Sequence, residues 1–199
     1  VIAAERLTDR FRSMAARFRQ PGLPLAASLE EPPLRSELFS ADQMELHGQY
    51  IVLRPLRVDD AELTLGWRES DRASLLNRGA KSVAEQEAWI ASRPNTERNF
   101  VIQLRSGQPV GMLSLVNIDE ANRRAEPARF LIGDPDSVRG LPVAVEAMKL
   151  LYELAFEQMK LQRVYGTVVA NNRLMIKWQK FLGMKEEGRL RQHYLIAGR

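Results

Sequence analysis

The residues most suggestive of chemistry lie between Phe130 and Ala155, where a strand, a tight turn and a helix are predicted in succession. The apolar run 130–132 suits a buried strand, and the sequence Gly-Asp-Pro-Asp breaks it. The helix carries Pro142 in its first turn, where a missing N–H costs nothing. Free backbone N–H groups and the positive end of the helix dipole would meet there, beside Arg139. These residues predict either an anion-binding turn or an ordinary strand-to-helix connection, and alone they favour neither.

The rest of the chain predicts the elements that would position this turn. Two helices begin at capping boxes, Asp59 with Glu62 and Ser82 with Glu85. A long apolar stripe after Pro142 predicts a third helix, and a fourth is predicted over 172–181. The predicted strands cover 49–55, 100–104, 110–116, 124–132, 163–169 and 184–194. One crossover among strands and helices indicates an α+β fold with a mixed sheet.

The N-terminal segment 1–45 reads as a helical extension with a linker, followed by a domain over 46–199. Residues 1–19 carry an apolar stripe at helical spacing, surrounded by arginines. This helix would pack on the domain or on a second chain, and a membrane-surface or partner-binding helix is the alternative. Residues 20–33 are rich in proline, and a short helix is possible over 34–47.

Composition limits the class of protein. With 199 residues the chain is long enough for one domain with an appendage, and it has no cysteine, so the cytoplasm is the default compartment. His47 and His193 are the only histidines, which argues against a structural metal site. No apolar run approaches a bilayer span, and no secretory leader is visible. The net charge of +4 is spread among acidic residues and gives no argument for nucleic acid.

The order of these motifs resembles the GNAT superfamily of acetyl-CoA-dependent N-acetyltransferases. The family's turn reads Q/R-x-x-G-x-G/A; Arg139 and Ala144 match its ends, and Pro142 replaces the central glycine. Met184 stands where a Gly-Phe ending usually has its phenylalanine. The segments 53–68 and 185–193 are similar to the branch of ribosomal-protein alanine and flagellin-type amino-sugar N-acetyltransferases.

The resemblance, which runs from about residue 50 to the end, implies a central, mostly antiparallel mixed sheet flanked by helices. Family members continue with a seventh strand beside the sixth, whereas this sequence ends at Arg199. We therefore expect either a chain that is a fragment of a longer protein or an edge covered by another chain, since an open edge favours association. The initial Val1 also suggests a fragment or a processed chain.

The resemblance implies acetyl-CoA as cosubstrate and no metal. The strand would pair with the pantetheine arm and the turn would hold the pyrophosphate. Arg139 is alternatively a surface arginine, and Asn172 is alternatively, or additionally, a helix N-cap. The cofactor-binding residues expected on this basis are Phe130, Leu131, Ile132, Arg139, Gly140, Leu141, Val143, Ala144 and Asn172.

Acetyl transfer to an amine needs a proton acceptor, an oxyanion donor and a proton for the departing thiolate. Glu126 is the candidate base, with an ion pair to Arg124 or Arg129 as the equal alternative. Gln179 stands where the family often has a tyrosine acid, and it cannot supply a titrating proton. His193 is a weaker candidate facing the acceptor, with a surface role as its alternative.

The acceptor pocket is expected to include Ser114, Asn117 and Asp119, for which ordinary strand and turn roles are the alternative. The resemblance implies an N-acetyltransferase acting by direct attack in a ternary complex. Its acceptor would be a nucleotide-linked amino sugar or a protein N-terminus, so the partner is a small-molecule or peptide amine, with a homodimer possible. The alternative is a catalytically degenerate binding or scaffold domain, favoured by Pro142 and Gln179.

Overall fold

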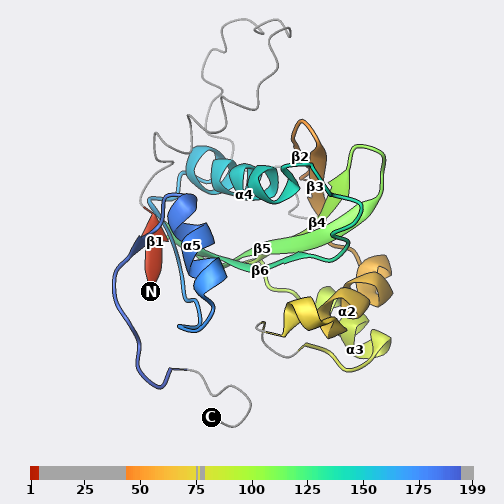
Figure 1. Cartoon of the computed structure of the whole chain (residues 1–199), viewed down its shortest axis with the longest axis horizontal. Coiled ribbons are helices and arrows are strands. Elements are labelled where there is room, and N and C mark those ends of the chain that lie inside the picture. The colour runs from red at the N-terminus through yellow and green to blue at the C-terminus, as the bar shows by residue number, and fades with distance from the viewer. Residues whose placement is uncertain (5–43, 75, 77–78, 194–199) are drawn as a thin grey trace, which may run out of the picture.

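The computed structural model describes residues 1–4, 44–74, 76 and 79–193, and in these a single sheet of eight strands forms the centre (Figure 1). The strands run in the spatial order β2-β3-β4-β5-β6-β7-β1-β8. All neighbours are antiparallel except β6 and β7, which are parallel. The predicted α+β class with a mixed, mostly antiparallel sheet is confirmed. The strands are β1 Ile2–Ala4, β2 Leu46–His47, β3 Ile51–Pro55, β4 Arg98–Leu104, β5 Pro109–Asp119, β6 Arg124–Ile132, β7 Arg163–Gly166 and β8 Lys185–Glu186.

Helices cover both faces of the sheet. Figure 1 shows α4 on one face and α2 with α3 on the other, while α5 lies near β1. Leu113 and Leu115 of β5 point to a large apolar cluster with α4, and Met112 points to a smaller cluster with Trp67 of α2. This alternation is the period of two expected of a strand buried on both faces. The helices are α2 Ala61–Glu69, α3 Val83–Ala91, α4 Val143–Glu153 continuing as a π-turn over Leu154–Gln158, and α5 Arg173–Phe181, with 3₁₀ turns over Val58–Asp60 and Asp71–Ala73.

Several element boundaries follow from local hydrogen bonds. Ser82 is the N-cap of α3, since its Oγ accepts from the Glu85 amide at 3.2 Å, as predicted. Asp59 does not cap α2, because a 3₁₀ turn precedes the helix; Asp60 is the N-cap residue, and its side chain makes no hydrogen bond to the amides of α2. The Asp60 carboxylate accepts from the Arg57 amide at 2.8 Å and from the Arg54 guanidinium at 2.7 and 2.8 Å. This buried ion pair fixes the connection from β3 to α2.

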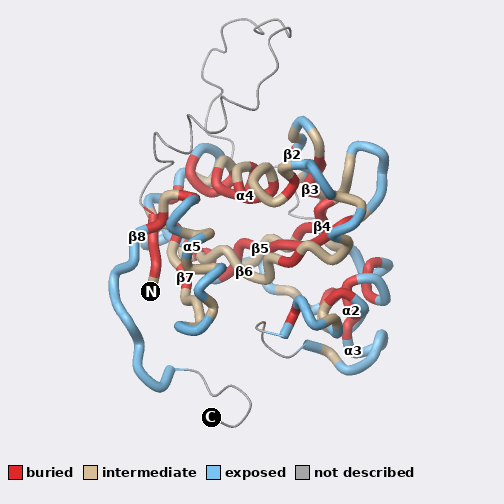
Figure 2. The backbone as a smooth tube through the Cα atoms, in the orientation of Figure 1, coloured by how far each residue is buried: buried red, intermediate tan, exposed pale blue. Residues whose placement is uncertain are grey.

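The N-terminal residues differ from the sequence prediction. Residues 2–4 form strand β1 rather than the start of a helix, and residues 5–19 of the predicted helix lie outside the described residues, as does the linker over 20–33. β1 pairs with both β7 and β8, and all three of its residues are buried, as Figure 2 shows. The Val1 amino group also donates to the Gly188 carbonyl at 2.7 Å. We expected an open edge beside the predicted strand over 184–194; the part of it that forms β8 pairs with the N-terminal strand β1 of the same chain.

Two further predictions change. The strand predicted over 184–194 shortens to Lys185–Glu186, while 187–193 has no regular structure and Tyr194 lies outside the described part. Leu46 and His47 form the short strand β2 instead of ending a helix, and residues 34–43 are not described. In the part of the chain that is described, no helix combines the length and apolar character needed to span a membrane.

Candidate active site

The parallel strands β6 and β7 part soon after they meet. Within the described residues their pairing is limited to Arg124 with Arg163 and Ala125 with Val164. The parting follows from the sequence, because Pro127 has no N–H to donate to a ladder. An opening between β6 and β7 therefore begins at Glu126, while β6 stays paired with β5 on its other side.

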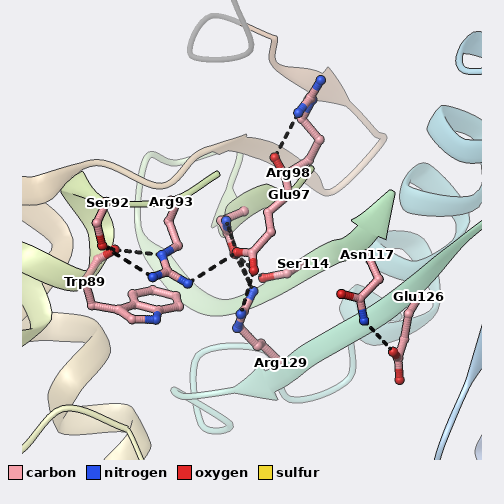
Figure 3. Close-up of polar contacts among 10 residues, drawn as sticks. Trp89, Ser92, Arg93, Glu97, Arg98, Ser114, Asn117, Glu126 and Arg129 are labelled. Carbon is pink, nitrogen blue, oxygen red and sulfur yellow. Dashed lines mark hydrogen bonds and ion pairs between the residues drawn. The ribbon is translucent and has the colours of Figure 1, made fainter. Parts of the chain in front are cut away.

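A bulge in β6 turns one arginine away from the strand. Met112 pairs with Leu131 and Ser114 pairs with Ala128, so two β6 residues, Arg129 and Phe130, lie opposite one β5 residue. Arg129 has φ of 54°, a left-handed conformation that is costly for a residue with a Cβ. Its guanidinium donates to the two Glu97 carboxylate oxygens at 2.9 and 3.1 Å (Figure 3). Strain of this kind persists where the surrounding contacts hold it.

Glu126 lies where the opening begins and is held by uncharged donors. Its Oε2 accepts from Asn117 Nδ2 at 3.0 Å, as Figure 3 shows, and its Oε1 accepts from the Thr167 amide at 3.4 Å. The ion pair considered from sequence is not formed, because Arg124 pairs with Asp119 and Arg129 with Glu97. Glu126 is thus a half-buried carboxylate without a cation among these contacts, which suits a group that takes up a proton.

A cavity of about 440 Å³ lies beside Glu126 and Asn117. It is bounded by α2, α3, the segment between them, and the strands β5 and β6. Its size suits a small molecule. The other residues that line it are Arg68, Leu76, Gly79, Ala80, Gln86, Trp89, Glu97, Val116, Ala128 and Arg129.

Charged groups in this cavity are closely packed. Burial alone would raise the pKa of Glu97, but hydrogen bonds from Arg129 and Asn99, with the charges of Arg129 and Arg93, outweigh it and lower that pKa. Burial lowers the pKa of Arg68, and the nearby charge of Arg129 lowers it further. The Trp89 ring lies under two guanidiniums, with Arg93 at 4.2 Å and Arg129 at 5.0 Å from its centroid.

His193 lies in a second cavity of about 690 Å³, on the other side of Thr167. This cavity lies between β1, the segment after β7, α5 and the C-terminal segment. Thr167 lines it and also donates to Glu126, so Glu126 lies at the boundary between the two cavities. His193 is exposed and is not among the contacts of Glu126.

Two of the three predicted acceptor residues lie elsewhere. Ser114 is buried, and its Oγ donates to Asn99 Oδ1 at 2.7 Å. The Asp119 carboxylate accepts from the Asn122 backbone and side chain, and these bonds together with Arg124 lower its pKa. Asn117 does line the cavity beside Glu126. Of the three, Asn117 therefore stays a candidate acceptor residue by its position.

The predicted pyrophosphate turn leads into α4. Arg139 is exposed, and its guanidinium pairs with Asp136 at 2.8 Å. Gly140 has φ of 81°, a conformation that favours glycine, and α4 begins at Val143 with Pro142 as its N-cap. The Leu141 amide donates to the Val138 carbonyl at 3.0 Å, so it is already used. The first-turn amides of α4, including Val143 and Ala144, have no acceptor within the helix.

Helix α5 lies beside the opening with an amphipathic face. Asn172 is its N-cap, since Oδ1 accepts from the Met175 amide at 3.1 Å. Trp178 stacks on Phe130 of β6 at 6.5 Å, and its buried indole Nε1 has no hydrogen-bond partner in the described part of the structure. Gln179 Oε1 accepts from the buried Tyr152 hydroxyl at 3.3 Å, which orients the amide. None of the residues of α5 is fully buried, as Figure 2 shows.

The residues expected to bind acetyl-CoA are compatible with that ligand. Three of them lie on β6 beyond the point where it parts from β7: Phe130, Leu131 and Ile132. The buried indole N–H of Trp178 has no acceptor in the described part of the structure and could donate to a ligand. Among the described residues, no group of three or more His, Cys, Asp or Glu side chains could hold a metal ion.

A mixed sheet in which two parallel central strands part is typical of the acetyltransferase class of proteins. Residues 51–185 match the model of the acetyltransferase (GNAT) domain family, and the chain belongs to this family. It is 32% identical over 103 residues to spermidine N(1)-acetyltransferase of Escherichia coli K12, covering 52% of this chain and 53% of the relative. It is 30% identical over 95 residues to a Bacillus subtilis protein provisionally named a ribosomal N-acetyltransferase, covering 48% of this chain and 50% of that protein.

The chain thus spans about half the length of the curated relatives that it matches. Among solved structures, a probable GNAT-family acetyltransferase from Chromobacterium violaceum superposes with a TM-score of 0.68 at 22% identity. That match covers 89% of this chain and 92% of the other. At this identity the likeness is one of fold.

Sequence reasoning missed the group that shapes the cavity. Arg68 lies on α2, Trp89 lies on α3, and Glu97 directly precedes β4. The available indication was the arginine-rich stretch around Glu97, in which Arg93 and Arg98 flank one acid.

Proposed function

We propose that this protein transfers the acetyl group of acetyl-CoA to a primary amine by direct attack in a ternary complex. The observation that carries the proposal is the parting of β6 from β7 at Glu126, in a chain that belongs to the GNAT family. Acetyl-CoA would supply the activated thioester. Everything else is done by side chains and backbone groups of this chain.

Glu126 has the role of proton acceptor. A primary amine is protonated at neutral pH, with a pKa of about 10, so it must lose a proton before it can attack a carbonyl carbon. Asn117 and the Thr167 amide orient the Glu126 carboxylate between the two cavities. Backbone N–H groups of β6 near Leu131 would stabilise the negative charge that develops on the carbonyl oxygen.

Binding of acetyl-CoA is assigned to β6, the turn and α5. The β6 backbone over 130–132 would pair with the pantetheine arm, and the first-turn amides of α4 with Arg139 would bind the pyrophosphate. We add Trp178 to the residues expected from sequence, since its ring stacks on Phe130 and its buried Nε1 has no partner in the described part of the structure. Gln179, oriented by Tyr152, is a hydrogen-bond donor for the departing thiolate rather than its acid.

The acceptor is a primary amine. The relatives bear on its identity only through the substrates in their names. The Escherichia coli relative is named for spermidine, which adds a polyamine to the amino sugar and protein N-terminus expected from sequence. All three share the amine that Glu126 would deprotonate. The cavity of about 440 Å³ favours a small molecule or the end of a chain over a folded protein surface.

A scaffold domain without catalysis is the second candidate. Pro142 removes one backbone donor from the turn, and Gln179 replaces a titrating group. Against it, Glu126 is oriented at an open cavity and Arg139 is exposed at the turn.

Calorimetric titration with acetyl-CoA tests the cosubstrate assignment. We expect saturable binding to the folded chain, weakened by about 10-fold or more in Arg139→Ala, since a charge-assisted hydrogen bond is worth about 1.5–3 kcal/mol. Arg105→Ala, which removes an exposed arginine bonded to the Gly48 carbonyl, should bind like the parent. A folded sample that takes up no acetyl-CoA at high concentration would favour the scaffold.

A further inference from the structure

A network of four polar side chains lies at the bulge in β6. The Arg129 guanidinium uses both terminal nitrogens: Nη1 donates to Glu97 Oε2 at 2.9 Å and to Asn99 Oδ1 at 3.0 Å, and Nη2 donates to Glu97 Oε1 at 3.1 Å. Asn99 Nδ2 donates to Glu97 Oε2 at 3.1 Å, and Asn99 Oδ1 accepts from the Ser114 hydroxyl at 2.7 Å. Figure 3 shows Glu97 and Ser114 beside the Arg129 guanidinium. The four side chains, which we call the bulge network, therefore bind one another.

The bulge network joins three neighbouring strands at one level of the sheet. Asn99 of β4 is paired with Ser114 of β5, and Ser114 is paired with Ala128, the residue before Arg129. The side chain of Ser114 is fully buried, and the Trp89 ring of α3 lies 5.0 Å from the Arg129 guanidinium. A buried polar network whose members find partners in one another is rigid. The Arg129 side chain is therefore held from β4, β5 and α3.

These contacts hold a backbone conformation that arginine does not favour. Arg129 has φ of 54°, which glycine adopts readily and residues with a Cβ adopt only at a cost. The hydrogen bonds to the Glu97 carboxylate join two charged groups, so they are stronger than bonds between neutral groups. They offset the cost of the left-handed backbone and keep the bulge in place.

The bulge determines which backbone groups of β6 face the opening toward β7. Along a strand, consecutive residues present their N–H and C=O groups alternately to one neighbouring strand and to the other. The extra residue of a bulge reverses this alternation for the residues that follow it. Leu131 belongs to the smaller apolar cluster and Ile132 packs against the larger one, so the side chains after the bulge also alternate between the two faces. Loss of the bulge would turn the backbone groups of 130–132 the other way.

We propose that Glu97, Asn99 and Ser114 are positioning residues for acetyl transfer, because through Arg129 they hold the bulge that turns the β6 backbone over 130–132 toward acetyl-CoA. This inference rests on the proposed function and extends its cosubstrate site to side chains that act without touching the ligand. It also gives Ser114 a role other than the acceptor pocket expected from sequence.

Two substitutions of Arg129 separate the backbone from the side chain. Arg129→Ala and Arg129→Gly both remove the bulge network, but glycine alone adopts the left-handed conformation without cost. We expect Arg129→Ala to weaken acetyl-CoA binding by about 10- to 100-fold in calorimetry, and Arg129→Gly to bind about 5- to 30-fold more tightly than Arg129→Ala. Equal weakening in both variants would show that the bulge is not the route. Affinity like that of the parent in Arg129→Ala would contradict any role of the network.

A double substitution tests whether the network acts through Arg129. Asn99→Ala should weaken acetyl-CoA binding by about 3- to 10-fold in the parent but by less than about twofold in Arg129→Gly. Additive losses would overturn the assigned route. Gln103→Ala is the matched control, since Gln103 lies on the same strand β4 and accepts from Arg54 Nε at 2.7 Å, outside the bulge network. It should bind acetyl-CoA like the parent.

Thermal unfolding tests the bulge without a ligand. In an ordinary strand glycine is less stable than alanine. At a left-handed position the order reverses, so the Tm of Arg129→Gly should exceed that of Arg129→Ala by about 2–4 °C. A lower Tm for Arg129→Gly would contradict the inference. If the folded parent takes up no acetyl-CoA, the proposed function fails and with it the role in acetyl transfer, while the order of the two Tm values still decides whether position 129 requires the left-handed backbone.

Discussion

Glu97 connects the end of α3 to the bulge in β6, and its ionisation should stabilise the folded protein. Contacts with Arg129, Asn99 and Arg93 lower its pKa below the ordinary 4.5, despite burial. Its contribution to the free energy of unfolding is therefore complete above about pH 4.5. The contribution is lost as the pH falls through the lower pKa of the folded state, because the unfolded chain takes up the proton first.

Glu97→Gln tests this at the scale of one residue. At neutral pH the variant should be less stable by about 1–3 kcal/mol, since two charge-assisted hydrogen bonds to Arg129 are weakened. Denaturant unfolding at a series of pH values should show a constant difference down to about pH 4.5 and a smaller one in stronger acid. A difference that grows on acidification would contradict the assigned direction.

At the same scale, the candidate base Glu126 and the candidate acceptor residue Asn117 were both named from sequence, and the structure brings them together. Glu126 and Asn117 lie on the paired strands β6 and β5, and the Asn117 side chain donates to the Glu126 carboxylate. Arg68 and Trp89 could not be placed, because their position depends on how the segment between α2 and α3 packs under the sheet. From sequence alone, a charged residue on a helix is predicted to face solvent, because its neighbours from other elements are unknown.

At the scale of elements, the close approach of β5 and β6 depends on a glycine. A Cβ on Gly111 would lie 2.4 Å from the Leu131 carbonyl oxygen, a backbone atom that cannot move aside alone. Gly111→Ala should therefore push β6 out of register near the bulge. We expect a loss of stability of about 1–3 kcal/mol and weaker acetyl-CoA binding, measured by urea unfolding and calorimetry.

Gly66 provides the matched control for this substitution. It lies exposed in α2, and a Cβ there would have nothing within 4 Å. Gly66→Ala should leave ligand binding unchanged and stabilise the helix by about 0.5–1 kcal/mol, since alanine has the higher helix propensity. Equal effects of the two substitutions would show that close packing at Gly111 is unimportant.

Elements with strong local patterns were predicted well and short ones poorly. β6 was predicted with its observed bounds. Ser82 marked the start of α3. β8 was predicted as eleven residues but contains Lys185–Glu186 alone, because its pairing partner β1 offers only Ile2 and Ala3, which the local sequence does not show.

At the scale of the whole molecule, the N-terminal strand completes the sheet. Ile2 is buried in the large apolar cluster and pairs with Gly166 of β7 and Glu186 of β8. Ile2→Ala should lower the free energy of unfolding by about 2–4 kcal/mol, a loss typical of a truncated core residue. Leu63→Ala, on the exposed side of α2, should change it by less than about 0.5 kcal/mol.

Urea unfolding of the two variants makes this comparison. A small effect of Ile2→Ala would mean that β1 contributes little to the sheet in solution.

The pairing of β1 was not predictable from sequence, because three residues are too few to show a period of two. The apolar stripe at helical spacing that begins at Leu7 also dominated the pattern. The strands that pair with β1 lie more than 150 residues away in the chain, and the local sequence gives no indication of such distant contacts.

The central claim is that Glu126 takes a proton from an amine that attacks acetyl-CoA. Release of free CoA thiol in the presence of an amine, compared between the parent and Glu126→Gln across pH, tests it most directly. We expect the variant to be slower by about 10²- to 10⁴-fold at neutral pH. The defect should shrink as the pH approaches the amine pKa of about 10, where the amine no longer needs a base. Equal rates for the parent and the variant at neutral pH would contradict the account.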